Sequence, residues 1–138
     1  MRILLDTNVL VAAFTTRGLC RDVVQIVLAE HQLIVGKTVL TELGRVLEDK
    51  LRMPTRQVKE VIAFVSEYAE VVVPIAPAAW PERDPDDQWV AAAALDGAAD
   101  ILVTGDKDLL DALHGAHLRV VTPRGLWDLL REQHSHCP

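Results

Sequence analysis

Long apolar runs and an excess of positive charge are both missing from this sequence. No uninterrupted apolar stretch reaches the roughly 18 residues that a membrane-spanning helix needs, and the N-terminal stretch 3–14 contains Asp6 and Asn8. We therefore expect neither a signal peptide nor a membrane span. The formal net charge of −6 argues against a protein that coats nucleic acid through Lys and Arg side chains. It says little about an enzyme whose acidic residues hold a cation.

Cysteine is scarce as well. Cys20 and Cys137 are the two cysteines of the chain and lie far apart in it, so no disulfide framework is indicated, and a reducing cytoplasm fits. The 138 residues, half of them hydrophobic, suffice for one domain with its own core. We expect this domain to span residues 1–132, with a flexible C-terminal tail at 133–138.

Short apolar runs alternate with amphipathic segments along the chain. Strands are predicted at 2–5, 33–35, 71–73, 101–104 and 118–121. Helices are predicted at 9–14, 19–30, 38–51, 55–68, 84–96, 106–113 and 123–132, with Thr55 as a cap and Pro123 in a first turn. This alternation predicts an α/β fold, a three-layer sandwich whose mainly parallel sheet is flanked by helices.

Acidic side chains follow two of the predicted strands. Asp6 comes directly after the first strand, and Asp106 follows the run 101–104 with Gly105 between them. Ligands of such sheets bind beyond the carboxyl ends of the strands, so we expect both acids at that edge. Each acid could equally serve as the N-cap of the next helix.

Two further acids are predicted near the same edge. Asp87 lies in a segment whose Asp84 and Pro85 are typical of a helix start, where carboxylates complement the helix dipole. Glu42 has no capping explanation; it lies beside the apolar stripe of its helix, where an i,i+3 pair with Arg45 is the alternative. Clustered carboxylates repel one another unless a cation joins them, and Mg²⁺ or Mn²⁺ suits such oxygen ligands.

In their order and spacing these residues closely resemble a PIN domain. The motifs are Asp6-Thr7-Asn8 after a strand, Glu42 on a helix, the segment 84–87 before an Ala-rich helix, and Thr104-Gly105-Asp106 after a strand. The resemblance extends to about residue 132 and is greatest to the VapC-like toxins of toxin–antitoxin systems. It implies a Mg²⁺- or Mn²⁺-dependent endoribonuclease, a homodimer and an antitoxin partner.

The resemblance also implies roles for individual residues. Asp6 and Asp87 would be the main metal ligands, and Glu42 and Asp106 would complete the catalytic acidic cluster. Residues expected to orient these acids or a water, or to lie at the periphery, are Thr7, Asn8, Thr104, Asp84 and Asp108.

Two matters stay open from the sequence. Lys37, Arg45, Arg83 and Lys107 lie near the expected site and could contact RNA phosphates, although charged residues on helices are more often simply solvated. The rival to a nuclease is a PIN-like binding module without useful activity, regulated or silenced by a protein partner.

Overall fold

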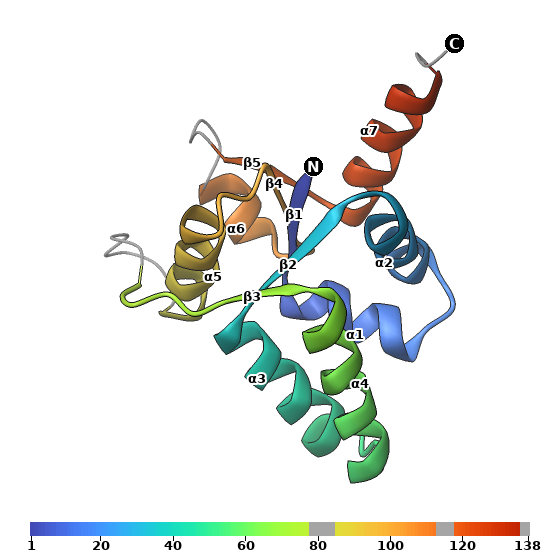
Figure 1. Ribbon diagram of the computed structural model, residues 1–138, viewed down its shortest axis with the longest axis vertical. Coiled ribbons are helices and arrows are strands. Elements are labelled where there is room, and N and C mark those ends of the chain that lie inside the picture. Colours follow the sequence, from blue (N-terminus) through green and yellow to red (C-terminus); the bar gives the residue numbers. More distant parts are fainter. Residues whose placement is uncertain (78–84, 113–117, 136–138) are drawn as a thin grey trace.

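The sheet of this protein has five strands, all parallel. The computed structural model describes residues 1–77, 85–112 and 118–135. The strand order is β3-β2-β1-β4-β5 (Figure 1). The strands are β1 (Arg2–Leu5), β2 (Gln32–Gly36), β3 (Glu70–Val72), β4 (Ile101–Val103) and β5 (Arg119–Val121). The α/β fold with a parallel sheet, predicted from the alternation of elements, is therefore confirmed.

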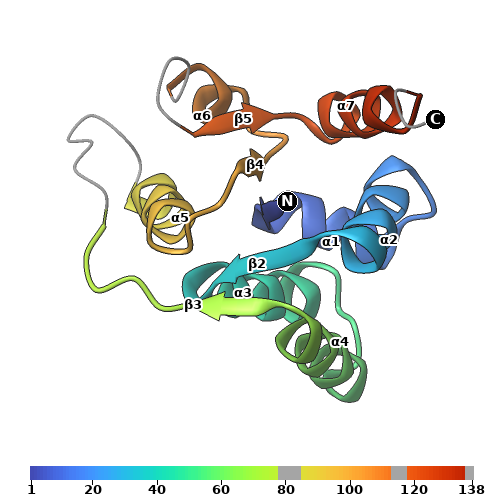
Figure 2. The same cartoon turned by 45° about the horizontal axis from the view of Figure 1, so that its top comes forward.

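Helices follow the strands and cover the sheet. They are α1 (Thr7–Thr15), α2 (Leu19–Glu30), α3 (Lys37–Arg45), α4 (Thr55–Tyr68), α5 (Pro85–Asp96), α6 (Lys107–Ala112) and α7 (Pro123–Ser135). In both views α5 and α6 lie on one side of the strands, and α2 and α7 lie on the other (Figures 1 and 2). Within the described ranges, no helix is long and apolar enough to cross a membrane.

From Ile3 to Leu5 the central strand β1 is apolar, because both of its faces are covered. Ile3, Leu4 and Leu5 are fully buried, and Leu4 is in register with Ile34 of β2 and Leu102 of β4. A strand buried on both faces shows a continuous apolar run rather than an alternating pattern. This explains why the short runs of the sequence located the strands to within two residues.

The Ala-rich helix α5 packs closely against the sheet. The side chains from Val90 to Ala94 are all buried. A Cβ atom added to Gly36, at the end of β2, would lie 2.9 Å from the Cβ of Ala93. The small residues of both elements thus allow α5 to approach the junction of β2 and α3.

Several local predictions need correction. The helix expected at 38–51 ends as α-helix at Arg45 and continues as a π-helical turn over Val46–Lys50, in which the Leu51 amide donates to the Val46 carbonyl. Thr55 is the first residue of α4 rather than its cap, and its hydroxyl donates to Glu48 instead. Helix α7 extends to Ser135, three residues into the stretch 133–138 where a tail was expected.

Candidate active site

The two predicted acidic loops lie side by side at the carboxyl edge of the sheet. Strands β1 and β4 are neighbours, with Leu5 in register with Val103, and the Asp6 amide donates to the Val103 carbonyl at 2.9 Å. The chain runs outward from β1 through β2 to β3, and then returns to β4 on the other side of β1. A site between β1 and β4 is therefore at the topological switch point, where ligands of such sheets bind.

Asp6 is held in place by two hydrogen bonds. Its Oδ1 accepts the Thr7 amide at 2.7 Å, and its Oδ2 accepts the Thr104 hydroxyl at 2.8 Å. The residue is 9% exposed, and it is the N-cap of α1. The capping prediction is therefore confirmed. The same geometry fixes the carboxylate at the sheet edge, so capping and a place in the site are compatible.

Thr104 connects this carboxylate to the second acidic loop. Its side chain is fully buried, and its hydroxyl oxygen accepts the Asp106 amide at 3.0 Å while donating to Asp6. The Gly105 amide donates to Oδ1 of Asn8 at 3.2 Å. Asn8 and Thr104 thus tie the start of α1 to the loop after β4, and they set the position of Asp106 relative to Asp6.

Glu42 joins the same network from helix α3. The Thr7 hydroxyl donates to Oε2 of Glu42 at 3.2 Å, and Thr7 itself is buried. The ion pairs formed between described residues join Arg2 to Glu70 and Arg56 to Glu60, so the Glu42–Arg45 pair considered from the sequence is not formed. Thr7 and Thr104 therefore link Asp6 to Glu42 on one side and to the loop of Asp106 on the other.

Asp87 lies half-buried near the start of α5. Val90, one turn further along the same helix, lines a pocket together with Glu42, and side chains three residues apart share a helix face. The described residues contain no group of three or more His, Cys, Asp or Glu side chains close enough to hold a metal ion. Asp84 and the side chain of Asp108 lie outside the described residues.

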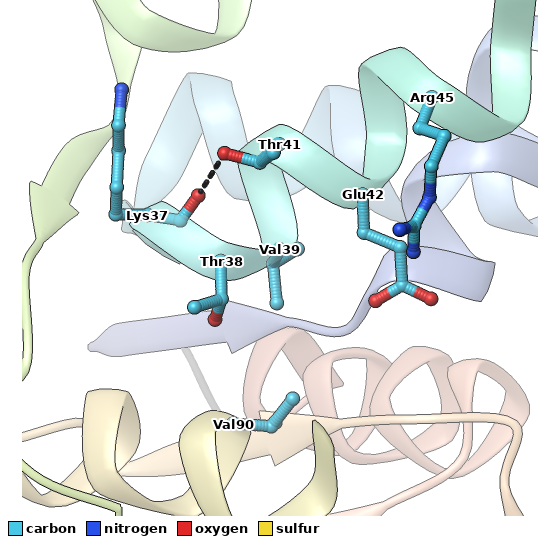
Figure 3. A pocket seen from close by; sticks show the side chains of 7 residues that line it. All are labelled: Lys37, Thr38, Val39, Thr41, Glu42, Arg45 and Val90. Atoms are coloured by element: carbon cyan, nitrogen blue, oxygen red, sulfur yellow. Dashed lines mark hydrogen bonds between the residues drawn. The ribbon is translucent and has the colours of Figure 1, made fainter. Parts of the chain in front are cut away.

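The pocket next to Glu42 has a volume of about 240 Å³ and lies between α3 and α5 (Figure 3). Two of the basic residues considered from the sequence, Lys37 and Arg45, line it. Lys107 is exposed at the start of α6, and Arg83 lies outside the described residues. The pocket is also lined by Thr38, Thr41 and Val90, which were not predicted from the sequence. The spacing of residues 38, 41 and 45 on one helix face was the available signal.

The chemistry of these side chains fits a hard divalent cation. Asp6 and Glu42 both present carboxylate oxygens toward Thr7, and the Thr104 hydroxyl also donates to Asp6. Mg²⁺ and Mn²⁺ prefer such oxygen ligands, and Mg²⁺ needs only one or two direct carboxylates, because waters and substrate complete its shell.

Comparison with known proteins agrees with this geometry. A family model described as the PIN domain matches residues 2–108, a range that contains all four acids and both threonines of the network. This chain belongs to the PIN-domain family. Among curated protein sequences, none matches it.

Solved structures with the same fold include two VapBC structures. The first is a crystal structure of VapBC2 from Rickettsia felis, bound to a DNA fragment from the VapBC2 promoter. The sequence identity is 17% and the TM-score is 0.65, and the match covers 88% of this chain and 98% of that chain. This chain is also similar to VapBC-1 from nontypeable Haemophilus influenzae, with 19% identity, a TM-score of 0.68, and 90% and 99% covered. At such identities the likeness shows the fold, so the PIN domain's chemistry must be argued from its own residues.

Proposed function

We propose that this PIN domain is a Mg²⁺- or Mn²⁺-dependent endoribonuclease that hydrolyses RNA phosphodiesters with a metal-activated water. PIN domains in general are nucleases that use divalent metals. The observation that carries the proposal is the pair of threonine links, which bring Asp6, Glu42 and the loop of Asp106 to one sheet edge. Asp6 and Glu42 accept these hydroxyl groups through their carboxylates, and Asp106 is bound to Thr104 through its backbone amide.

The protein's own residues prepare the site before substrate arrives. The Thr7 amide and the Thr104 hydroxyl fix the orientation of the Asp6 carboxylate through its two oxygens. Asp6 and Asp87 would hold the cation, and a bound Mg²⁺ or Mn²⁺ would supply a Lewis acid that polarises a phosphate oxygen and lowers the pKa of a water ligand. Glu42 or Asp106 would orient the attacking water and accept its proton.

The partner proposal rests on the family and on the neighbouring structures. We propose that the chain acts as the toxin of a toxin–antitoxin pair, as a cytoplasmic homodimer whose activity an antitoxin suppresses. Both neighbours are VapBC structures, which supports a protein partner for this fold. Copurification of the untagged chain with a tagged product of an adjacent gene, followed by inhibition of cleavage, would test the pairing.

The decisive test of the nuclease compares wild type with Asp87→Asn on single-stranded and structured RNA, with Mg²⁺, with Mn²⁺ and with EDTA. Asp96→Asn is the matched control, because Asp96 is an exposed acid at the other end of the same helix. We expect cleavage by wild type and by Asp96→Asn that requires the metal, and nearly none by Asp87→Asn. Equal activity of wild type and both variants would disprove the assignment of Asp87. No cleavage by folded wild type, with no metal bound in calorimetry, would favour the binding module.

A further inference from the structure

The pocket between α3 and α5 adjoins the acidic network through one shared residue, Glu42. Glu42, whose carboxylate is bonded to Thr7 in the acidic network, also lines this pocket. The other lining residues come from α3, except Val90 of α5, which faces them (Figure 3). A ligand that fills the pocket therefore lies directly beside the proposed site of cleavage.

Two cations stand at opposite ends of this pocket. Figure 3 shows Lys37 at one end and Arg45 at the other. Both side chains are exposed, and neither forms an ion pair with a residue that the structure describes. Arg45 follows Lys37 by eight positions, which correspond to about 12 Å along a helix. That separation suits two phosphates of one strand better than a single phosphate group.

The middle of the pocket combines hydroxyl groups with apolar surface. The Thr41 hydroxyl donates to the Lys37 carbonyl at 3.1 Å, so its oxygen presents lone pairs to a ligand. Val39 and Val90 supply buried methyl groups opposite each other. The pocket volume of about 240 Å³ is slightly below the range of roughly 300–1,000 Å³ for small-molecule sites. A pocket of this size is appropriate for one nucleotide and too small for a longer segment of RNA.

We propose that this pocket binds the RNA nucleotide next to the scissile phosphodiester. Lys37 and Arg45 contact the phosphates on its two sides, Thr38 and Thr41 contact ribose hydroxyls, and the two valines contact the base or sugar. Contacts to 2′-hydroxyls and phosphates are the ordinary means by which proteins hold RNA. The inference rests on the proposed ribonuclease function, and it makes Lys37 and Arg45 substrate-positioning residues.

The test measures RNA binding without turnover. Fluorescence anisotropy of a labelled, random-sequence, single-stranded RNA is recorded with Ca²⁺ in place of Mg²⁺, for wild type and Lys37→Ala/Arg45→Ala. We expect the double variant to bind about 5- to 20-fold more weakly, as for two exposed charges. The slope of log K against log salt should fall by about 1.4, since each single-strand phosphate contact contributes about 0.7. With Mg²⁺, KM should rise while kcat stays within about 2-fold.

Two variants separate positioning from general charge and from structure. Lys59→Ala/Arg124→Ala removes the same charge from exposed positions of α4 and α7 that do not line the pocket, and it should bind like wild type. Lys37→Arg/Arg45→Lys keeps both charges and should bind within about 3-fold of wild type, because single-phosphate contacts need charge rather than a bidentate fork. A merely structural role would not show this rescue.

The outcomes distinguish the inference from the function on which it rests. If wild type cleaves RNA with metal but Lys37→Ala/Arg45→Ala keeps the wild-type affinity, KM and salt slope, the pocket assignment is wrong and the nuclease stands. If wild type does not bind RNA, the inference is overturned. If the double variant loses binding of a poly-glutamate peptide but not of RNA, the pocket belongs to an acidic protein partner and the inference is equally overturned.

Discussion

The Thr104 hydroxyl oxygen lies 2.8 Å from Oδ2 of Asp6, although the two residues are 98 positions apart in the chain. Thr104 has no solvent exposure, and Asp6 has little. The same hydroxyl accepts the Asp106 amide. One small buried side chain therefore determines where two acidic residues from different strands stand relative to each other.

Replacing Thr104 by valine should impair both the fold and the site. Valine has the shape of threonine but lacks the hydroxyl, so Asp6 loses a donor and the Asp106 amide loses its acceptor. We expect the free energy of unfolding to fall by about 1–3 kcal/mol and RNA cleavage to fall by about 10- to 100-fold. Urea titration and initial cleavage rates measure the two effects, and Thr104→Ser should restore most of both.

Thr122 provides a control for that prediction. Its hydroxyl accepts the Gly125 amide at 2.9 Å at the start of α7, and it follows Val121, whose carbonyl accepts the Thr104 amide at 3.0 Å. Thr122→Val should cost about 1 kcal/mol of stability, as for a lost helix cap, while cleavage stays at the wild-type rate. An equal loss of activity in both valine variants would show that stability, rather than positioning of Asp6, limits activity.

Glu42→Gln should separate the charge of this residue from its structural role. The glutamine side chain keeps an oxygen that can accept the Thr7 hydroxyl, so stability should stay within about 0.5 kcal/mol. Cleavage should fall by about 10- to 100-fold, since a neutral amide neither accepts a proton nor supports a cation as a carboxylate does. Glu48→Gln is the control, because Glu48 accepts the Thr55 hydroxyl at 2.8 Å on the surface and should leave cleavage unchanged.

Gly36→Ala should push α5 away from the sheet. The added Cβ would lie 2.9 Å from that of Ala93, and overpacking of this kind costs about 1–3 kcal/mol. Because α5 carries Asp87, cleavage should decrease as well. Gly36→Ala/Ala93→Gly removes the clash and should regain part of the stability, less the cost of about 1 kcal/mol for a helical glycine.

The comparison for this variant is Gly44→Ala. A Cβ at Gly44 meets atoms of Ile62 at 3.6 Å, which is an ordinary contact, so alanine should stabilise α3 by about 0.5–1 kcal/mol. Thermal unfolding of wild type, Gly36→Ala, Ala93→Gly and the double variant forms a double-mutant cycle, which gives the coupling between positions 36 and 93. Gly44→Ala is measured in the same way. Strict additivity of the two substitutions would contradict the predicted clash.

Arg2 should contribute to stability through more than its ion pair. Its guanidinium donates to Glu70 of β3 at 2.5 Å and to the Gly97 carbonyl after α5 at 2.7 and 3.0 Å. We expect Arg2→Ala to cost about 1–2 kcal/mol, and Glu70→Ala only about 0.5 kcal/mol, because the pair is partly solvated. Arg56→Ala, which breaks an exposed i,i+4 pair with Glu60, should be close to neutral in urea titrations. Equal effects of Arg2→Ala and Glu70→Ala would mean that the Gly97 contacts contribute nothing.

Cys20 should react slowly with alkylating reagents. Burial raises the pKa of its thiol, and the thiolate is the reactive form, so less of it is present at neutral pH than in an exposed cysteine. We expect iodoacetamide to modify Cys20 at pH 7 more slowly than it modifies glutathione, with the rate rising toward alkaline pH. Peptide mass spectrometry identifies the modified site, and a rate equal to that of glutathione would contradict the effect of burial.

The sequence by itself determined the layer architecture and the order of the acids. Short runs rich in apolar residues located all five strands, since strands of a covered sheet carry such runs. Turn and helix signals located the helices between them. Asp6 and Asp106 could be assigned to one edge because each directly follows a strand, and parallel strands end at the same edge.

Only the tertiary structure decided which side chains meet. The order β3-β2-β1-β4-β5 places the loop of Thr104 beside Asp6, and α3 places Glu42 against Thr7 rather than in a pair with Arg45. The π-helical turn after Arg45 was likewise not predictable from the sequence, nor was the position of Val90 of α5 opposite the pocket residues of α3. Periodicity and capping are local properties of the chain. These contacts instead depend on which strands are neighbours and on how closely the helices pack against the sheet, and both are determined by residues that are distant in the sequence.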